Sequence, residues 1–128
     1  MPCDDIVSAK AHQGSLNYHS GLAAEDSVVQ HYVMAGANPV ARRWRGKAGE
    51  VDLVLRLGDI HLFVEVKKAA TFGMAAERLT SAQLARVSSA AEEFIASLPD
   101  GDSGFIRVDA ALVDGTGRVE VIENVTLA

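Results

Sequence analysis

The stretch Gly49–Lys68, GEVDLVLRLGDIHLFVEVKK, decides the fold of this chain. Two alternating runs, Glu50 to Leu57 and Ile60 to Lys67, flank the pair Gly58-Asp59. A glycine in the first position of a two-residue loop is typical of the tight turns that join antiparallel strands. The pattern therefore predicts a β-hairpin.

The turn also fixes the register of this hairpin. Successive strand side chains alternate between the two faces, so a loop at Gly58-Asp59 sets Asp52 opposite Glu65 and Glu50 opposite Lys67. We expect one face to be hydrophobic core and the other to hold chemistry. The expected core face comprises Val51, Leu53, Leu55, Leu57, Ile60, Leu62, Val64 and Val66. The other face carries Glu50, Asp52, Val54, Arg56, His61, Phe63, Glu65 and Lys67.

The opposition of Asp52 and Glu65 predicts a cation site. Their β-carbons would lie about 5 Å apart, and like charges directly opposed on paired strands are destabilising. At an effective dielectric constant near 20, the repulsion is roughly 3 kcal/mol if both are ionised. Mg²⁺ would offset it, because this ion favours oxygen ligands and is held by one or two carboxylates plus waters and substrate phosphate. The alternative is a solvated face on which Glu50 pairs with Lys67 and one carboxyl has a raised pKa.

Length and composition predict a single domain. With 128 residues and 48% hydrophobic content, the chain fits one compact domain. Residues 1–18 show no sustained period, so we expect a flexible tail there and the domain over residues 19–128. No apolar run approaches the ~20 residues of a membrane span, and a signal-peptide pattern is missing, which favours a cytoplasmic protein. The single cysteine, Cys3, permits no internal disulfide.

Charge is distributed unevenly along the chain. The formal net charge is −5, yet residues 41–68 contain seven basic and four acidic residues, a net +3, which leaves −8 for the remainder. A basic patch beside clustered carboxylates suits a phosphodiester substrate and a metal. The candidate nucleic-acid contacts are Arg42, Arg43, Arg45, Lys47 and Lys68. The alternative is that residues 42–47 are a solvated edge strand protected from aggregation.

A helix is expected from Ser20, as its N-cap, to about Ala35. Glu25 lies within roughly 60° of its apolar stripe, so an acid sits on the buried face. From spacing alone, Glu25 is better explained by a favourable interaction with the helix N-terminal dipole.

The remaining elements follow from local signals. We expect a strand over Val40 to Arg45 and a mobile link over Ala69 to Leu79. Trp44 is expected to be a packing anchor, and the alternative is that it stacks on a base. Thr80 and Gln83 form a capping box that opens a helix ending before Pro99. Two final strands, Gly104 to Val113 and Arg118 to Val125, complete the predicted order αβββαββ. Arg107 and Asp109 share a strand face and are expected to form a surface pair unless the fold brings them to the hairpin. The four histidines show no metal-ligand spacing.

Three sequence features together resemble a known family. Glu25 in the first helix, the Gly-Glu-x-Asp of residues 49–52 and the Glu-x-Lys of Glu65 and Lys67 are similar to the YraN-like family of predicted endonucleases. That family belongs to the PD-(D/E)XK, or restriction-endonuclease-like, superfamily. The likeness runs from about Gly21 to Asn124 and implies an α/β fold with a central mixed sheet flanked by helices.

The resemblance also implies a function. It implies a Mg²⁺- or Mn²⁺-dependent nuclease in which Asp52 and Glu65 bind the metal, Lys67 stabilises developing charge and Glu25 completes an acidic pocket. Glu50 and Gln83 would be auxiliary, and Gln83 stands where many relatives have lysine. The expected partner is nucleic acid, DNA rather than RNA and branched DNA foremost, and homodimerisation is left open. The alternative function is a non-catalytic nucleic-acid-binding or adaptor protein that keeps the nuclease fold.

Overall fold

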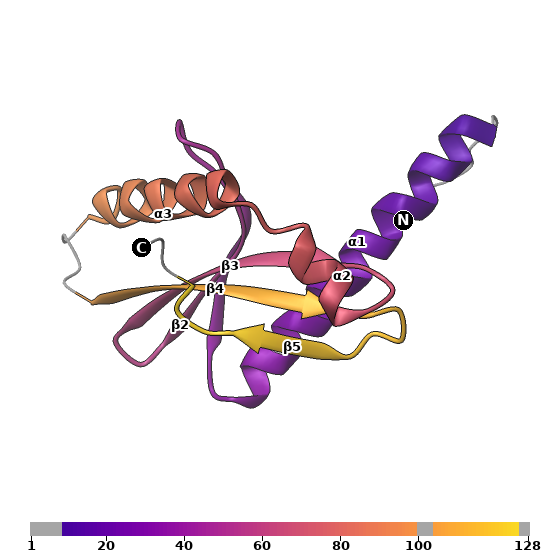
Figure 1. Ribbon diagram of the computed structural model, residues 1–128. Helices are drawn as coiled ribbons and strands as arrows, with labels where there is room; N and C mark the ends of the chain where they lie inside the picture. The colour runs from indigo at the N-terminus through magenta and orange to yellow at the C-terminus, as the bar shows by residue number, and fades with distance from the viewer. Residues whose placement is uncertain (1–8, 100–103, 126–128) are drawn as a thin grey trace.

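The computed structural model describes the backbone of residues 9–99 and 104–125, and the side chains from Gly21 onward within those ranges. The elements are α1 (Ala9–Met34), β1 (Asn38–Arg45), β2 (Glu50–Leu57), β3 (Ile60–Lys68), α2 (Phe72–Glu77), α3 (Ser81–Ala96), β4 (Phe105–Val113) and β5 (Val119–Ile122). The five strands form one sheet in the order β1-β2-β3-β4-β5 in the described part of the chain (Figure 1). Only β3 and β4 pair in parallel, so the sheet is mixed, as expected.

The central hairpin has the predicted register. β2 and β3 pair from Leu57↔Ile60 to Leu53↔Val64, and Gly58 begins the turn with a φ of 60°. That conformation is strained for residues with a β-carbon, so glycine is the suitable residue in the first loop position. The paired register stops at Leu53↔Val64, just before Asp52 and Glu65 would face each other.

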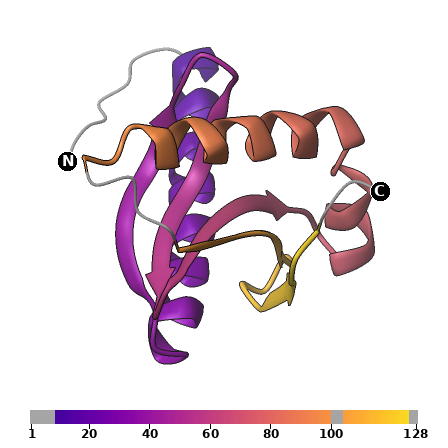
Figure 2. The ribbon, with the colours of Figure 1, turned by 90° about the vertical axis from the view of Figure 1, so that its left-hand side faces the viewer.

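Helices cover both faces of the sheet. Figure 2 shows α3 lying across one face while α1 passes behind the strands on the other. On the α1 side, Val28 and Tyr32 pack against apolar residues of the hairpin, among them Leu55 and Leu62. This is the core face expected from the sequence.

The second hairpin face is also core, which corrects the expectation of one buried and one chemical face. Val54 and Phe63 are buried beneath Val87 and Phe94 of α3. Val51, expected on the α1 side, packs in this second cluster. A sheet covered by helices on both faces needs apolar side chains on both, so neither face of the hairpin is free for a polar site.

Two local predictions are wrong. The first helix begins at Ala9, so Ser20 is not its N-cap and part of the expected tail is helical; residues 1–8 of that tail lie outside the described residues. No proline interrupts residues 9–34, and each of the two interior glycines, Gly14 and Gly21, costs the helix only about 1 kcal/mol. The expected mobile link contains α2, which Thr71 caps by accepting a hydrogen bond from the Met74 backbone N–H and which Ala75 anchors in the core.

Two other local predictions, the α3 capping box and the packing of Trp44, are confirmed. The capping box at Thr80 and Gln83 forms both of its reciprocal hydrogen bonds. Trp44 packs edge-to-face on Phe94, with ring centroids 5.3 Å apart. No helix in the described residues is both long and apolar enough to cross a membrane.

Arg107 and Asp109 do not form a surface pair. Asp109 is fully buried between α1 and the segment after β5, where it binds Arg107, the Tyr32 hydroxyl and the Asn124 backbone N–H. Strand alternation predicted that the two residues share a face, but it carried no information about what covers that face.

Candidate active site

The predicted site residues gather at one end of the sheet. Because β2 and β3 are antiparallel, the start of β2 and the end of β3 meet there, and α1 passes beside them. Two cavities open at this end, and Asp52 lines both. The larger, of about 370 Å³, is lined by Gly21, Ala24, Glu25, Asp52, Val66, Lys67, Lys68 and Arg78. The smaller, of about 190 Å³, is lined by Glu50, Asp52, Glu65, Gln83, Arg86 and Val87.

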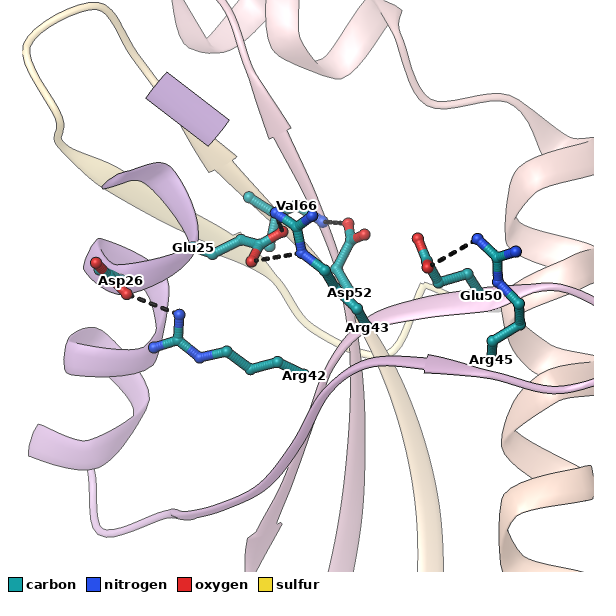
Figure 3. Close-up of polar contacts among 8 residues, drawn as sticks. All are labelled: Glu25, Asp26, Arg42, Arg43, Arg45, Glu50, Asp52 and Val66. Carbon is teal, nitrogen blue, oxygen red and sulfur yellow. Dashed lines mark hydrogen bonds and ion pairs between the residues drawn. The ribbon is translucent and has the colours of Figure 1, made fainter. Parts of the chain in front are cut away.

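Asp52 is held by the neighbouring strand. Its Oδ2 atom accepts a hydrogen bond of 2.8 Å from the Val66 backbone N–H (Figure 3). In a continued ladder Val66 would face Val51, so the Asp52 side chain binds an N–H that the ladder would otherwise use. Burial, and next the negative charge of Glu65, raise the pKa of Asp52 to about 6, although the Val66 N–H and Lys67 act in the opposite direction. A cation between the two carboxylates would remove much of this cost.

Glu65 and Lys67 form an ion pair. Lys67 Nζ lies 3.2 Å from Glu65 Oε2, and the two side chains are only 18% and 12% exposed. Residues two apart on a strand share a face, which explains the contact. The alternative pairing of Glu50 with Lys67 does not form, because Glu50 instead pairs with Arg45 at 3.4 Å. Lys67 therefore lies beside the carboxylate pair, at the wall of the larger cavity.

Glu25 comes to the site from α1. It is only 7% exposed, and burial is the main cause that raises its pKa, with a smaller contribution from Asp52. The Arg43 guanidinium opposes this shift, with Nη2 lying 3.2 Å from Glu25 Oε2 (Figure 3). The explanation of Glu25 by the helix N-terminal dipole is wrong, since α1 begins at Ala9, several turns earlier.

Arg43 reaches Glu25 from an unusual backbone conformation. Its φ is 53°, in the left-handed region that residues with a β-carbon rarely adopt. Such strain persists only where the surrounding structure holds it, and it clusters at functional sites. Here it accompanies an arginine aimed at the buried acid of the site.

The arginines of the predicted basic patch all contact carboxylates. Arg42 binds Asp26 at 2.7 Å, Arg43 binds Glu25, and Arg45 binds Glu50, as Figure 3 shows. Lys47 donates its backbone N–H to Glu93 of α3, and Lys68 lines the larger cavity. The positive charge of β1 is therefore largely balanced by acids of α1 and β2.

Two arginines at the site were not predicted from the sequence. Arg78 follows α2 and lines the larger cavity, and Arg86 of α3 lines the smaller one. Arg78 lay in a segment without periodicity, so no local signal identified it. Arg86 stands three residues after Gln83, a spacing that places two residues on one helix face, and this could have been noticed. Gln83 lines the smaller cavity while its Oε1 accepts the Thr80 backbone N–H.

The residues fit a hydrated divalent cation. Among the side chains that the structure describes, no three His, Cys, Asp or Glu residues form a cluster able to hold a metal ion. Asp52 and Glu65 are adjacent carboxylates that repel each other. Mg²⁺ keeps several waters and needs only one or two carboxylates, so this pair suits Mg²⁺ better than a metal enclosed by protein ligands.

The family profile and three similar proteins all point to the same family. The profile described as "Uncharacterised protein family UPF0102" matches residues 24–122. The chain is 49% identical over 118 residues to a UPF0102 protein of Ruegeria pomeroyi, covering 92% of this chain and 96% of that protein. A UPF0102 protein of Roseobacter denitrificans is 45% identical over 118 residues, covering 92% of each chain. A UPF0102 protein of Cereibacter sphaeroides is 47% identical over 111 residues, covering 87% of this chain and 95% of that protein.

Proposed function

Because the chain belongs to the UPF0102 family, whose description states no activity, the site itself must indicate the chemistry, and we propose a metal-dependent nuclease that hydrolyses phosphodiester bonds in DNA. The observation that carries the proposal is the convergence of Glu25, Asp52, Glu65 and Lys67 on one end of the sheet. These four residues come from three elements, α1, β2 and β3, and they line the two cavities at that end. Branched or otherwise structured DNA is the proposed substrate class.

The proposed fold relationship is to the PD-(D/E)XK superfamily through the YraN-like endonucleases. It is supported by the mixed sheet with a helix on each face and by the acids at the start of β2 and the end of β3. The parallel pairing of β3 with β4 makes β3 a central strand, so its last residues are held rigidly. A rigid element suits a site whose geometry must be precise.

Each residue has a proposed role. Asp52 and Glu65 would hold Mg²⁺ or Mn²⁺, which when bound polarises a phosphate and lowers the pKa of a coordinated water. Lys67, held by Glu65, places its ammonium where negative charge develops on the phosphate oxygens. Glu25, with its raised pKa, would accept a proton or a hydrogen bond from water in the larger cavity. Glu50 and Gln83 line the smaller cavity and would have auxiliary roles.

A second candidate is a nucleic-acid-binding or adaptor protein without catalysis. It is favoured by the net charge of −5 and by the ion pairs that engage Arg42, Arg43 and Arg45. The two candidates differ in one property, which is metal-dependent cleavage.

The test is a cleavage assay on labelled linear duplex, single-stranded and branched DNA with Mg²⁺, Mn²⁺ or EDTA. The nuclease proposal expects cleavage of at least one substrate that requires metal and is lost in Asp52→Asn. Arg56→Ala is the control, because Arg56 lies by the hairpin turn, at the far end of the sheet, where it binds the Gly58 carbonyl. Binding without metal-dependent cleavage by the wild-type protein would favour the non-catalytic candidate.

A further inference from the structure

We infer that Arg78 binds the DNA phosphate next to the scissile one, in the larger of the two cavities, so that the substrate strand enters the site past α2. The inference rests on the proposed function and adds a phosphate subsite to it. It assigns this contact to a residue outside the predicted basic patch.

The two cavities differ in charge. The larger is lined by two acids, Glu25 and Asp52, and by three bases, Lys67, Lys68 and Arg78, a net +1. Around the smaller cavity, three acids face the single base Arg86, a net −2. A polyanionic strand that must pass Asp52 is therefore favoured on the larger side, because local charge decides which groove an anion enters.

Arg78 has donors available for a phosphate. Its Nη1 donates to the Lys68 carbonyl oxygen at 2.8 Å, which fixes the guanidinium at the cavity. In the part of the chain that the structure describes, no carboxylate lies within ion-pair distance of Arg78. A guanidinium has five N–H donors and binds phosphate through two parallel hydrogen bonds, so one bond to a carbonyl leaves that mode open.

The short helix α2 positions Arg78. This residue is the C-cap of α2, and its backbone N–H donates to the Ala75 and Ala76 carbonyl oxygens. Ala75 is fully buried against Ala69 and Leu112, which ties α2 to the ends of β3 and β4. Figure 1 shows α2 at the end of the sheet where β4 terminates. The fold thus holds Arg78 in place before any substrate binds.

Fluorescence anisotropy with fluorescein-labelled duplex and branched DNA, in EDTA and over a series of salt concentrations, tests the inference. Arg78→Ala should weaken binding about tenfold, because a hydrogen-bonded contact to a charged group is lost. It should also reduce the slope of log affinity against log salt by about 1, as expected for one phosphate contact. Arg78→Lys keeps the positive charge but cannot form two parallel hydrogen bonds to phosphate. Its DNA affinity should therefore lie between those of wild type and Arg78→Ala.

Two other arginines serve as comparisons. Arg56→Ala removes an arginine that also binds one carbonyl oxygen at 2.8 Å, at the other end of the sheet, and should bind like wild type. Arg86→Ala reports on the smaller cavity and should weaken binding less than Arg78→Ala. Equal losses for Arg78→Ala and Arg56→Ala, equal losses for Arg78→Ala and Arg86→Ala, or no DNA binding by wild type would each overturn the inference.

The same proteins separate this inference from the proposed function. Where metal-dependent cleavage occurs, Arg78→Ala should raise KM more than it lowers kcat, since the contact holds substrate away from the reacting phosphate. Wild-type binding that depends on Arg78, without cleavage that depends on Asp52, would support the subsite and remove the nuclease assignment. Cleavage that depends on Asp52, with DNA binding that does not depend on Arg78, would support the nuclease assignment and overturn the Arg78 subsite.

Discussion

At the scale of single residues, Asp52 carries a cost in the metal-free protein. Burial and the Glu65 carboxylate raise its pKa from 3.8 to about 6. The folded protein therefore binds this proton more tightly than the unfolded chain, and folding takes up a proton between about pH 4 and pH 6. In that window the free energy of unfolding falls as pH rises, by at most about 3 kcal/mol for this group.

Asp52→Asn should remove this pH dependence. In EDTA, the free energy of unfolding of wild type should fall relative to that of Asp52→Asn as pH rises from about 4 to 6. Urea denaturation across this range measures it, and Asp59→Asn, at the hairpin turn, is the control for loss of an exposed carboxylate. A difference between Asp52→Asn and wild type that stays constant with pH would contradict the assignment.

Added Mg²⁺ tests the same carboxylate in another way. A ligand that binds only the folded state raises its melting temperature, so Mg²⁺ should raise that of wild type and of Asp59→Asn but not that of Asp52→Asn. An equal rise in all three proteins would place the cation elsewhere.

Lys67→Ala should keep the fold and lose cleavage. Losing one preorganised group that acts on developing charge costs about 3–4 kcal/mol in the transition state, or about a hundred- to a thousandfold in rate. The pair with Glu65 is mostly buried, so its loss should cost more stability than the 0–1 kcal/mol of an exposed pair. Single-turnover cleavage well below the melting temperature measures the rate. A rate within a few-fold of wild type would show that Lys67 has a structural role only.

At the scale of elements, the helix termini place site residues. The capping box at the start of α3 engages Gln83, which lines the smaller cavity, and α2 ends at Arg78, which lines the larger. Both helices begin at a threonine whose hydroxyl accepts a backbone N–H. The ends of these helices thus position groups that belong to the site.

Thr80→Ala should destabilise the protein by about 1 kcal/mol, because the Gln83 backbone N–H loses its acceptor at the helix N-terminus. Thr80→Ser keeps the hydroxyl and should stay close to wild type. Urea denaturation of the three proteins gives the difference. Equal destabilisation by alanine and serine would mean that the threonine methyl group, and not the cap, stabilises α3.

At the scale of the whole molecule, Asp109 connects three parts of the chain. Its carboxylate accepts hydrogen bonds from the Tyr32 hydroxyl of α1, from Arg107 of β4 and from the Asn124 backbone N–H after β5. Burial, and next the hydrogen bond to Asp109, raise the pKa of Tyr32 well above its usual range, so the hydroxyl remains a donor. This buried network fixes α1, and with it Glu25, against the sheet.

Asp109→Ala should cost about 3–5 kcal/mol of stability, because the Tyr32 hydroxyl and the Asn124 N–H lose their buried acceptor and Arg107 keeps only its longer ion pair with Glu123, at 3.7 Å. Tyr32→Phe removes one hydrogen bond to a charged group and should cost about 2 kcal/mol. Chemical denaturation of both single variants and the double variant measures the coupling between them. Additive losses would show that the two side chains do not act as one network.

The sequence by itself determined the hairpin, its turn and its register, the cap of α3 and the apolar face toward α1. These are local properties, because strand alternation, a glycine turn and a threonine cap depend on residues close together in the chain. It also indicated which carboxylates and which lysine would meet, since Asp52 and Glu65 lie on the two arms of one hairpin. Which residues lie opposite one another in the hairpin follows from its register alone.

Only the tertiary structure decided how charges pair and what is buried. Arg45 rather than Lys67 binds Glu50, Arg43 binds Glu25 across 18 residues of sequence, and Asp109 is buried rather than exposed. Arg78 reaches the larger cavity because α2 packs on the ends of β3 and β4. Ion pairing and burial depend on which elements cover one another, and sequence periodicity gives the face of each element without identifying the element that packs against it.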